Sequence, residues 1–273
     1  MTLAVSNIAW PADEEAAVAQ ALADLSVSAV EIAPTKVFAD PLAASDEQVA
    51  DYLSFWADHG VSVVAFQSML FGRPELTVFD DSDVRRATQN HLAGFIDLAA
   101  RMGASVLVFG SPKNRRVPPG MSDAEADDIA ADFFGLLGEI AAASGTQLLL
   151  EPNPTAYDCN YVYTAQQGSA LVARVANQGF GLHLDVAGMT LAGDDSYTAI
   201  TGNPHISHFH VSAPQLGEIE ETEVDHDRAA RALAAIDYRN VVSIEMRPGA
   251  PGEAADRVRR AVGVARRHYA DVL

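Results

Sequence analysis

Eight short apolar runs alternate along this chain with longer amphipathic segments, and this alternation constrains the fold more than any other feature of the sequence. Apolar runs of four to six residues bounded by turn residues are typical of buried strands, whereas the segments between them are long enough for helices. The expected strands are Leu3–Ser6, Ala29–Ile32, Ser62–Phe66, Ser105–Phe109, Gln147–Leu150, Gly181–Leu184, Ile206–His210 and Val242–Glu245. The expected helices are Asp13–Leu25, Asp46–His59, Asp83–Met102, Ser122–Ala143, Ala165–Ala176, Tyr197–Thr201, His226–Ala235 and Gly252–Tyr269. Eight strand–helix units in order predict an α/β protein whose parallel strands close into a single (β/α)8 TIM barrel.

The length of the chain agrees with one barrel. Closed barrels of roughly 250 residues commonly form a single unit, and this chain has 273 residues. No Ser/Gly linker, charge block or low-complexity run marks a second domain, so residues 1–273 are expected to form one TIM-barrel domain. The connections after the strands are longer than those after the helices, which favours the carboxyl ends of the strands as the place where a site is built.

The charge balance limits the classes of molecule that the protein is expected to bind. The chain has 18 basic and 37 acidic residues, a formal charge of −19. Such a field repels phosphate backbones and anionic lipids, so we expect no nucleic-acid and no membrane partner, and a small molecule instead. Cys159 is the only cysteine, which excludes an intrachain disulfide and fits a reducing compartment. The first residues lack a basic segment followed by an apolar one, so a cytoplasmic protein is expected.

Four of the apolar runs end on a potential metal ligand. Glu151 follows LLL, Asp185 closes FGLHLD, His210 closes ISHFH and Glu245 closes VVSIE. The spacings (185−151=34, 210−185=25, 245−210=35) are each about one strand–helix unit. Successive strands of a barrel would therefore bring three carboxylates and one imidazole to one end. Hard oxygens with one imidazole nitrogen suit a divalent ion such as Mn²⁺, Mg²⁺, Co²⁺ or Zn²⁺.

The motifs EPNP, HLD, HFH and SIEM resemble those of the xylose isomerase-like TIM barrel superfamily. The similarity is greatest to its sugar isomerase and epimerase branch, which includes ketose 3-epimerases and hydroxypyruvate isomerases, and it extends over essentially the whole chain. The resemblance implies that Glu151, Asp185, His210 and Glu245 bind one divalent metal ion, with Mn²⁺ as the first choice. It further implies that Glu151 and Glu245 form the pair that transfers protons.

The chemistry of these residue types supports the same function. Moving a proton next to a carbonyl passes through an enediolate, whose negative charge a divalent cation stabilises. Two carboxylates on either side of that intermediate can take the proton from one face and return it on the other. The sequence therefore predicts a metal-dependent isomerase or epimerase of a sugar or sugar-like polyhydroxy substrate, with Glu151 and Glu245 as acid and base.

Other polar residues near the strand ends are candidates for substrate contacts. His183 and His208 each lie two positions before a ligand, so strand alternation points them the same way, one layer deeper in the barrel. Lys113 lies in a basic loop that can bind an anionic group of the substrate. The full set of substrate-binding candidates is His183, His208, Lys113, Asn153, Arg247, Glu31 and Gln67.

Two other functions remain open on the sequence alone. A metal-dependent dehydratase or lyase acting on a keto-sugar or keto-inositol would use the same enediolate. A non-enzyme alternative is a catalytically silent sugar-binding or partner subunit that kept the barrel. A homo-oligomer is also open, because Val258, Ala261, Val262 and Ala265 of the last helix can either form an interface or cover the barrel.

Overall fold

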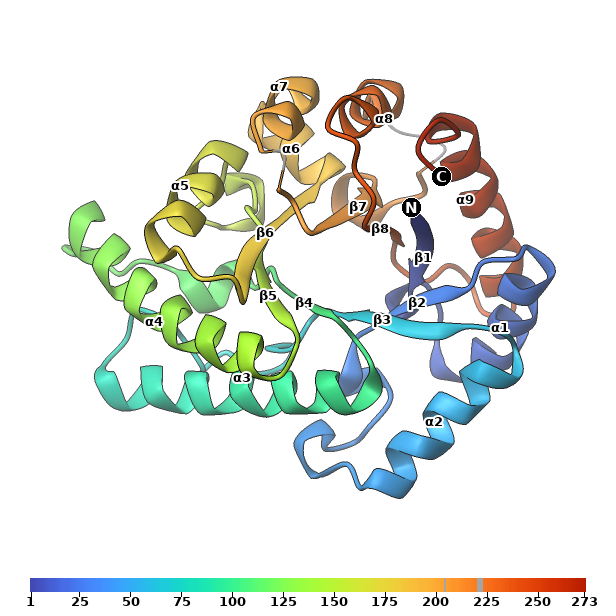
Figure 1. Ribbon diagram of the computed structural model, residues 1–273, viewed down its shortest axis with the longest axis horizontal. Helices are drawn as coiled ribbons and strands as arrows, with labels where there is room; N and C mark the ends of the chain where they lie inside the picture. The colour runs from blue at the N-terminus through green and yellow to red at the C-terminus, as the bar shows by residue number, and fades with distance from the viewer. Residues whose placement is uncertain (204, 220–222) are drawn as a thin grey trace.

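The computed structural model describes residues 1–203, 205–219 and 223–273. Its strands close into one parallel barrel in the order β1-β2-β3-β4-β5-β6-β7-β8, with β1 paired to β8. Helices surround this ring on all sides (Figure 1). The strands are β1 (Thr2–Ser6), β2 (Ala29–Ile32), β3 (Ser62–Phe66), β4 (Val106–Phe109), β5 (Gln147–Leu150), β6 (Phe180–Asp185), β7 (His208–Ser212) and β8 (Val241–Glu245). The predicted (β/α)8 TIM barrel is confirmed.

Nine α-helices and seven short 3₁₀ helices are assigned within the described part of the chain. The α-helices are α1 (Glu15–Asp24), α2 (Asp46–Asp58), α3 (Ser82–Met102), α4 (Asp123–Ala143), α5 (Ala165–Val175), α6 (Val186–Ala192), α7 (Ser196–Thr201), α8 (His226–Ala235) and α9 (Ala254–His268). The 3₁₀ helices are η1 (Asn7–Ala9), η2 (Ala12–Glu14), η3 (Pro34–Lys36), η4 (Pro41–Ala43), η5 (Pro112–Arg115), η6 (Thr155–Tyr157) and η7 (Pro214–Leu216). No helix among the described residues combines the length and the apolar character needed to cross a bilayer.

Local signals in the sequence fix where the helices begin and end. Ser45 accepts a hydrogen bond from the backbone of Gln48, whose side chain bonds back to Ser45, so α2 starts with a complete capping box. The helix α3 ends at Gly103, whose φ of 76° is easily adopted by a residue without a Cβ atom. These ends explain why the helix boundaries differ by only one or two residues from those that the sequence predicts.

The last helix packs against the barrel. Val258, Ala261, Val262 and Ala265 are between 0 and 4% exposed and belong to the hydrophobic core. Apolar positions on α9 therefore cover the strands, which is one of the two alternatives that the sequence left open. A face buried in this way is not available for a contact between subunits.

Two elements next to the candidate ligands differ from the prediction. β7 was expected at Ile206–His210, but it pairs with β8 as far as Ser212, which lies opposite Glu245. His210 is therefore in the middle of its strand, below the rim of the barrel. The sequence predicts no helix directly after Asp185, yet α6 begins at Val186. It is capped by Asp185, whose Oδ1 accepts a hydrogen bond from the backbone N–H of Gly188 at 2.5 Å.

Candidate metal centre

The four predicted ligands meet at the carboxyl end of strands β5 to β8. Glu151 follows β5 directly, Asp185 ends β6, and Glu245 ends β8. Asp185 is in register with His210 of the neighbouring strand. Because parallel strands present their carboxyl ends at one rim, segments separated by up to 94 positions (245−151=94) share one small volume.

The donor atoms of these residues are close together. Glu151, Asp185 and His210 each offer an atom, and these atoms lie within 4.8 Å of one another. Nδ1 of His210 lies 3.4 Å from Oε2 of Glu245 and 3.9 Å from Oδ2 of Asp185. His210 and Asp185 are buried, and the two glutamates are partly buried. Three carboxylates thus converge on one imidazole.

The tautomer of His210 suits a metal ligand. Its Nε2 lies 2.9 Å from Oε2 of Glu31, which is completely buried on β2. Since an ionised carboxylate only accepts hydrogen bonds, Nε2 carries a proton, and Nδ1 is the nitrogen that would bind a metal ion after losing its own proton. Nδ1 is buried and makes no hydrogen bond to any part of the chain that the structure describes. A buried nitrogen that faces carboxylates and has no hydrogen bond fits a divalent cation, which would take the place of its proton.

The electrostatics of the cluster also favour a cation. Burial and the repulsion of Glu245 and Asp185 raise the pKa of Glu151 to about 8. Burial and Glu245 likewise raise the pKa of Asp185 to about 6. Although burial alone acts in the opposite direction, Glu31 and Glu245 hold the pKa of His210 well above its usual value. Negative charge is therefore crowded at this point, and a bound cation relieves the repulsion.

Glu31 has a different place from the one that the sequence suggested. It was predicted as a substrate contact, but the structure gives it no exposed surface. Burial alone raises its pKa, yet the attraction of His210 and His208 lowers the pKa to about 2. A permanently ionised carboxylate behind His210 orients the imidazole and keeps its proton on Nε2.

Two residues that the sequence analysis missed shape the ligands. Ser212 donates a hydrogen bond of 2.5 Å to Oδ2 of Asp185, so Asp185 is held at both oxygens together with its bond to Gly188. Gly110 follows β4, and a Cβ atom at this position would overlap Oε2 of Glu151. The glycine that follows β4 is the feature of the sequence that could have indicated this contact. A glycine in or beside a strand often marks a place where another group approaches the backbone closely.

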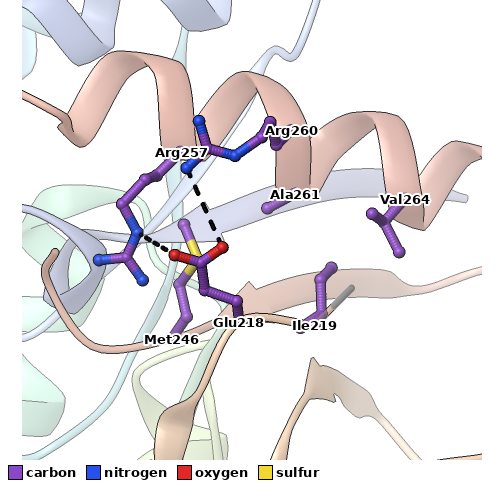
Figure 2. A pocket seen from close by; sticks show the side chains of 7 residues that line it. All are labelled: Glu218, Ile219, Met246, Arg257, Arg260, Ala261 and Val264. Carbon is purple, nitrogen blue, oxygen red and sulfur yellow. Dashed lines mark ion pairs between the residues drawn. The ribbon is translucent and has the colours of Figure 1, made fainter. Parts of the chain in front are cut away.

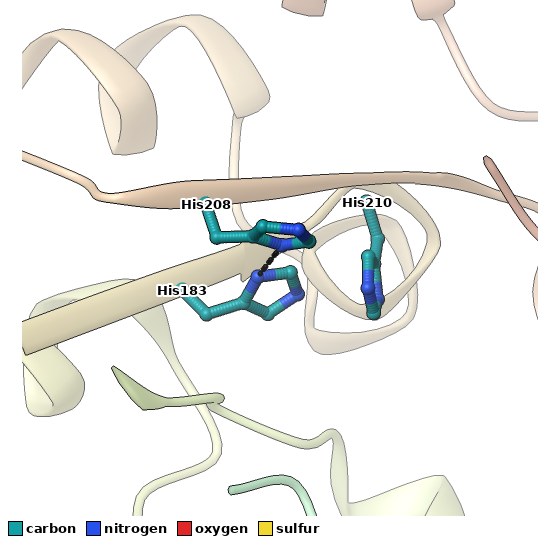
Figure 3. A group of neighbouring side chains, drawn as sticks. All are labelled: His183, His208 and His210. Carbon is teal, nitrogen blue, oxygen red and sulfur yellow. Dashed lines mark hydrogen bonds between the residues drawn. The ribbon is translucent and has the colours of Figure 1, made fainter. Parts of the chain in front are cut away.

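His183 and His208 form the next layer inside the barrel. They are paired in register on β6 and β7, both without exposed surface. Figure 3 shows their rings beside one another, with a hydrogen bond of 3.1 Å between the two Nδ1 atoms and the ring of His210 across from them. The ring centroids of His183 and His210 lie 4.2 Å apart. These imidazoles pack beneath the candidate metal ligands, and burial keeps the pKa of both below the usual histidine value, at about 4 for His208.

The remaining predicted substrate contacts are spread over the rim. Asn153 and Gln67 are buried, and the side-chain amide of Gln67 donates a hydrogen bond to the hydroxyl of Ser6. Lys113 and Arg247 are exposed. Of the three basic residues at positions 113, 115 and 116, the buried one is Arg115, which the sequence analysis did not select.

A hydrogen bond joins two of the loops that follow strands carrying candidate metal ligands. The hydroxyl of Tyr157 accepts a hydrogen bond of 2.8 Å from the backbone N–H of Gln215, which joins the loops after β5 and β7.

Figure 2 shows a pocket between the loop after β7 and α9, where Oε1 of Glu218 lies 3.1 Å from Nε of Arg257. Met246 lines this pocket. Because it follows Glu245 on the chain, it faces away from the barrel interior, so the pocket is separate from the metal centre.

Comparison with known proteins agrees with this geometry. The model of the xylose isomerase-like TIM barrel family matches residues 19–268. A ketose 3-epimerase of Arthrobacter globiformis is 25% identical over 194 residues, which cover 69% of this chain and 65% of that relative. The matched stretch thus spans less than two thirds of the relative's length.

Solved structures show the same fold over nearly the whole chain. A D-psicose 3-epimerase of Clostridium cellulolyticum H10, determined with D-tagatose, has a TM-score of 0.83 at 16% identity, covering 98% of this chain and 99% of that one. A 3-keto-D-glucoside 4-epimerase of E. coli has a TM-score of 0.79 at 17% identity, with coverage of 98% and 99%. At such identities the likeness concerns the fold.

Proposed function

The chain belongs to the xylose isomerase-like TIM barrel family, and from this premise we propose that it is a metal-dependent sugar isomerase or epimerase. The observation that carries the proposal is the convergence of Glu151, Asp185 and Glu245 on the imidazole of His210. The ketose 3-epimerase relative and the neighbour determined with D-tagatose support a ketose or a similar polyhydroxy carbonyl compound as substrate.

The proposed mechanism uses two carboxylates. Glu151 and Glu245 leave from different strands and approach the same imidazole, so a substrate held at this point lies between them. One carboxylate removes the proton next to the carbonyl, and the other supplies a proton to the opposite face, which inverts that carbon. The divalent ion, when bound, stabilises the negative charge of the enediolate as a Lewis acid. Asp185 and His210 complete the ligand set.

The donor set also suggests the metal. Three carboxylates and one imidazole favour Mn²⁺, with Mg²⁺, Co²⁺ and Zn²⁺ as alternatives.

Within the proposed function, Asn153, Gln67, Lys113 and Arg247 are candidates for contacts with the hydroxyl or anionic groups of the substrate. We further propose that residues 1–273 work as one domain in the cytoplasm. The formal charge of −19 favours small-molecule partners over nucleic acid.

Solvent deuterium incorporation tests this function. The protein is loaded with Mn²⁺ and incubated in D₂O with ketoses, sugar phosphates and keto-inositols, and deuterium at the carbon next to the carbonyl is followed by NMR. We expect incorporation with at least one ketose, and its loss in Glu151→Gln and Glu245→Gln, which keep the fold. Undiminished exchange in both variants would exclude their acid–base role. A dehydrated product without any epimer would instead identify the lyase alternative.

A further inference from the structure

Arg115 is a completely buried cation beside the candidate metal centre, and the proposed reaction gives it no role. It lies at the end of η5, in the loop after β4. Burying a guanidinium is costly unless its donors are satisfied by well-placed acceptors. Nε and Nη2 of Arg115 have such acceptors, whereas Nη1 has none among the described residues. The neighbouring Arg116 is exposed, so burial of Arg115 is not a general property of this basic loop.

The guanidinium binds both ends of the loop between β5 and α5, residues 151–164. Its Nη2 donates to the backbone oxygen of Glu151 at 2.7 Å and to Oδ1 of Asn153 at 3.2 Å. Its Nε donates to the backbone oxygen of Tyr161 at 3.1 Å, and Nη2 also reaches that of Val162 at 3.5 Å. One side chain thus joins residues 151 and 153 at the start of a long loop to residues 161 and 162 near its end.

The end of this loop is held in an unfavourable conformation. Val162 has a φ of 56°, in the left-handed region that a β-branched residue rarely adopts. Its backbone oxygen accepts hydrogen bonds from the backbone N–H of Asn153 at 3.3 Å and from Arg115. Such a conformation persists only when surrounding contacts impose it, and strained residues of this kind gather at functional sites.

The residue before Arg115 anchors the same turn on its other side. The side-chain amide of Asn114 donates to the backbone oxygens of Arg73 and Leu76 at 2.8 and 2.7 Å, and its own backbone oxygen accepts from Val78 at 2.8 Å. Arg115 is therefore fixed to the loop after β3 while it binds the loop after β5. A rigid support is what a side chain needs in order to position another.

We propose that Arg115 is a positioning residue that clamps residues 151–164 so that Glu151 and Asn153 face the metal centre. It acts through the backbone of Glu151 and need not touch the substrate. Only the expected effect of Arg115 on turnover rests on the proposed function. Its expected effect on the ordering of residues 151–164 does not depend on any reaction.

The test compares Arg115→Lys with Arg116→Lys, the same substitution at the exposed neighbour. Lysine keeps the charge but cannot donate along several directions from a planar group. We expect Arg115→Lys to lower kcat about 10- to 100-fold with little change in KM. We also expect amide hydrogen exchange in residues 151–164 to accelerate, in metal-free and in Mn²⁺-loaded protein. Arg116→Lys should change neither. Equal behaviour of the two variants would overturn the proposal.

A second substitution separates clamping from general stabilisation. Val162→Gly removes the penalty of the left-handed conformation. In the Arg115→Lys background it should therefore recover kcat by about fivefold or more, with little effect in the wild type. A loss of kcat that Val162→Gly leaves unchanged would contradict clamping. If Arg115→Lys does not fold, Asn153→Ala takes its place, and unchanged exchange in residues 151–164 of that variant counts against the clamp.

Failure of the proposed function gives a different result. In that case the wild type incorporates no deuterium into any substrate, whereas the exchange difference between Arg115→Lys and Arg116→Lys persists.

Discussion

Nε2 of His210 lies 2.9 Å from Oε2 of Glu31, although 179 positions separate the two residues. β2 and β7 are not adjacent in the barrel, so this contact crosses its interior. It keeps a proton on Nε2 and leaves Nδ1 as the candidate ligand atom, so the orientation of this candidate ligand depends on a carboxylate that has no exposed surface. Loss of such support behind a ligand typically weakens metal binding about 10- to 100-fold.

Replacing Glu31 by Gln should weaken metal binding about 10- to 100-fold. The amide can donate to Nε2 of His210, which would move the imidazole proton to Nδ1 and block the lone pair that faces the acids. Calorimetric titration with Mn²⁺ measures the affinity. Glu15→Gln, at a carboxylate that bonds to Tyr52, is the control and should bind Mn²⁺ like the wild type. Equal affinity of Glu31→Gln and wild type would show that Glu31 does not set the tautomer.

Gly110→Ala should lower kcat about 100-fold, because the added Cβ atom overlaps Oε2 of Glu151 and displaces the proposed acid–base group. The matched control is Gly135→Ala on α4, where an added Cβ atom meets nothing within 4 Å. That substitution should leave kcat unchanged and raise the free energy of unfolding by about 0.5–1 kcal/mol. Steady-state kinetics and urea unfolding give both quantities. Full activity of Gly110→Ala would mean that Glu151 need not occupy its present position.

His226 should make the stability depend on pH. Burial and the nearby His268 lower its pKa to about 4, while its Nδ1 lies 3.0 Å from the hydroxyl of Tyr269. An unfolded histidine titrates near 6.5, so between these values the unfolded chain binds more protons than the folded one. This contribution to the free energy of unfolding is complete above about pH 6.5 and is lost as the pH falls towards 4. It amounts to about 3 kcal/mol.

Urea unfolding of the wild type and His226→Gln between pH 4 and 7.5 measures this contribution. The difference in free energy of unfolding between the two proteins should shrink as the pH falls through this window. His205→Gln, at an exposed histidine, controls for the loss of an imidazole. A difference that stays constant with pH would show that His226 is not kept neutral by the fold.

The barrel was predictable because it depends on patterns within short segments. Apolar runs, capping residues such as Ser45 and terminal glycines such as Gly103 each act over a few positions. The regular spacing of strand ends then brings Glu151, Asp185 and Glu245 to one rim. These inferences need no knowledge of which side chains meet across the barrel.

What the sequence could not provide depends on closure of the barrel. The position of His210 within β7 follows from pairing with β8 up to Ser212, which no local pattern encodes. The contact with Glu31 requires two strands that are far apart in the sequence to face one another. In the basic loop, the sequence does not distinguish Lys113, Arg115 and Arg116 by their environment, whereas packing buries Arg115. Burial of one cation among three is a property of the packed loops.

Titration of the metal-free protein with Mn²⁺ tests the central claim most directly, with Asp185→Asn beside the exposed control Asp132→Asn on α4. We predict one saturable site per chain in the wild type and in Asp132→Asn, and strongly weakened binding in Asp185→Asn. Binding by Asp185→Asn equal to that of the wild type, or no saturable site for Mn²⁺, Mg²⁺, Co²⁺ or Zn²⁺, would contradict a metal centre at Glu151, Asp185, His210 and Glu245.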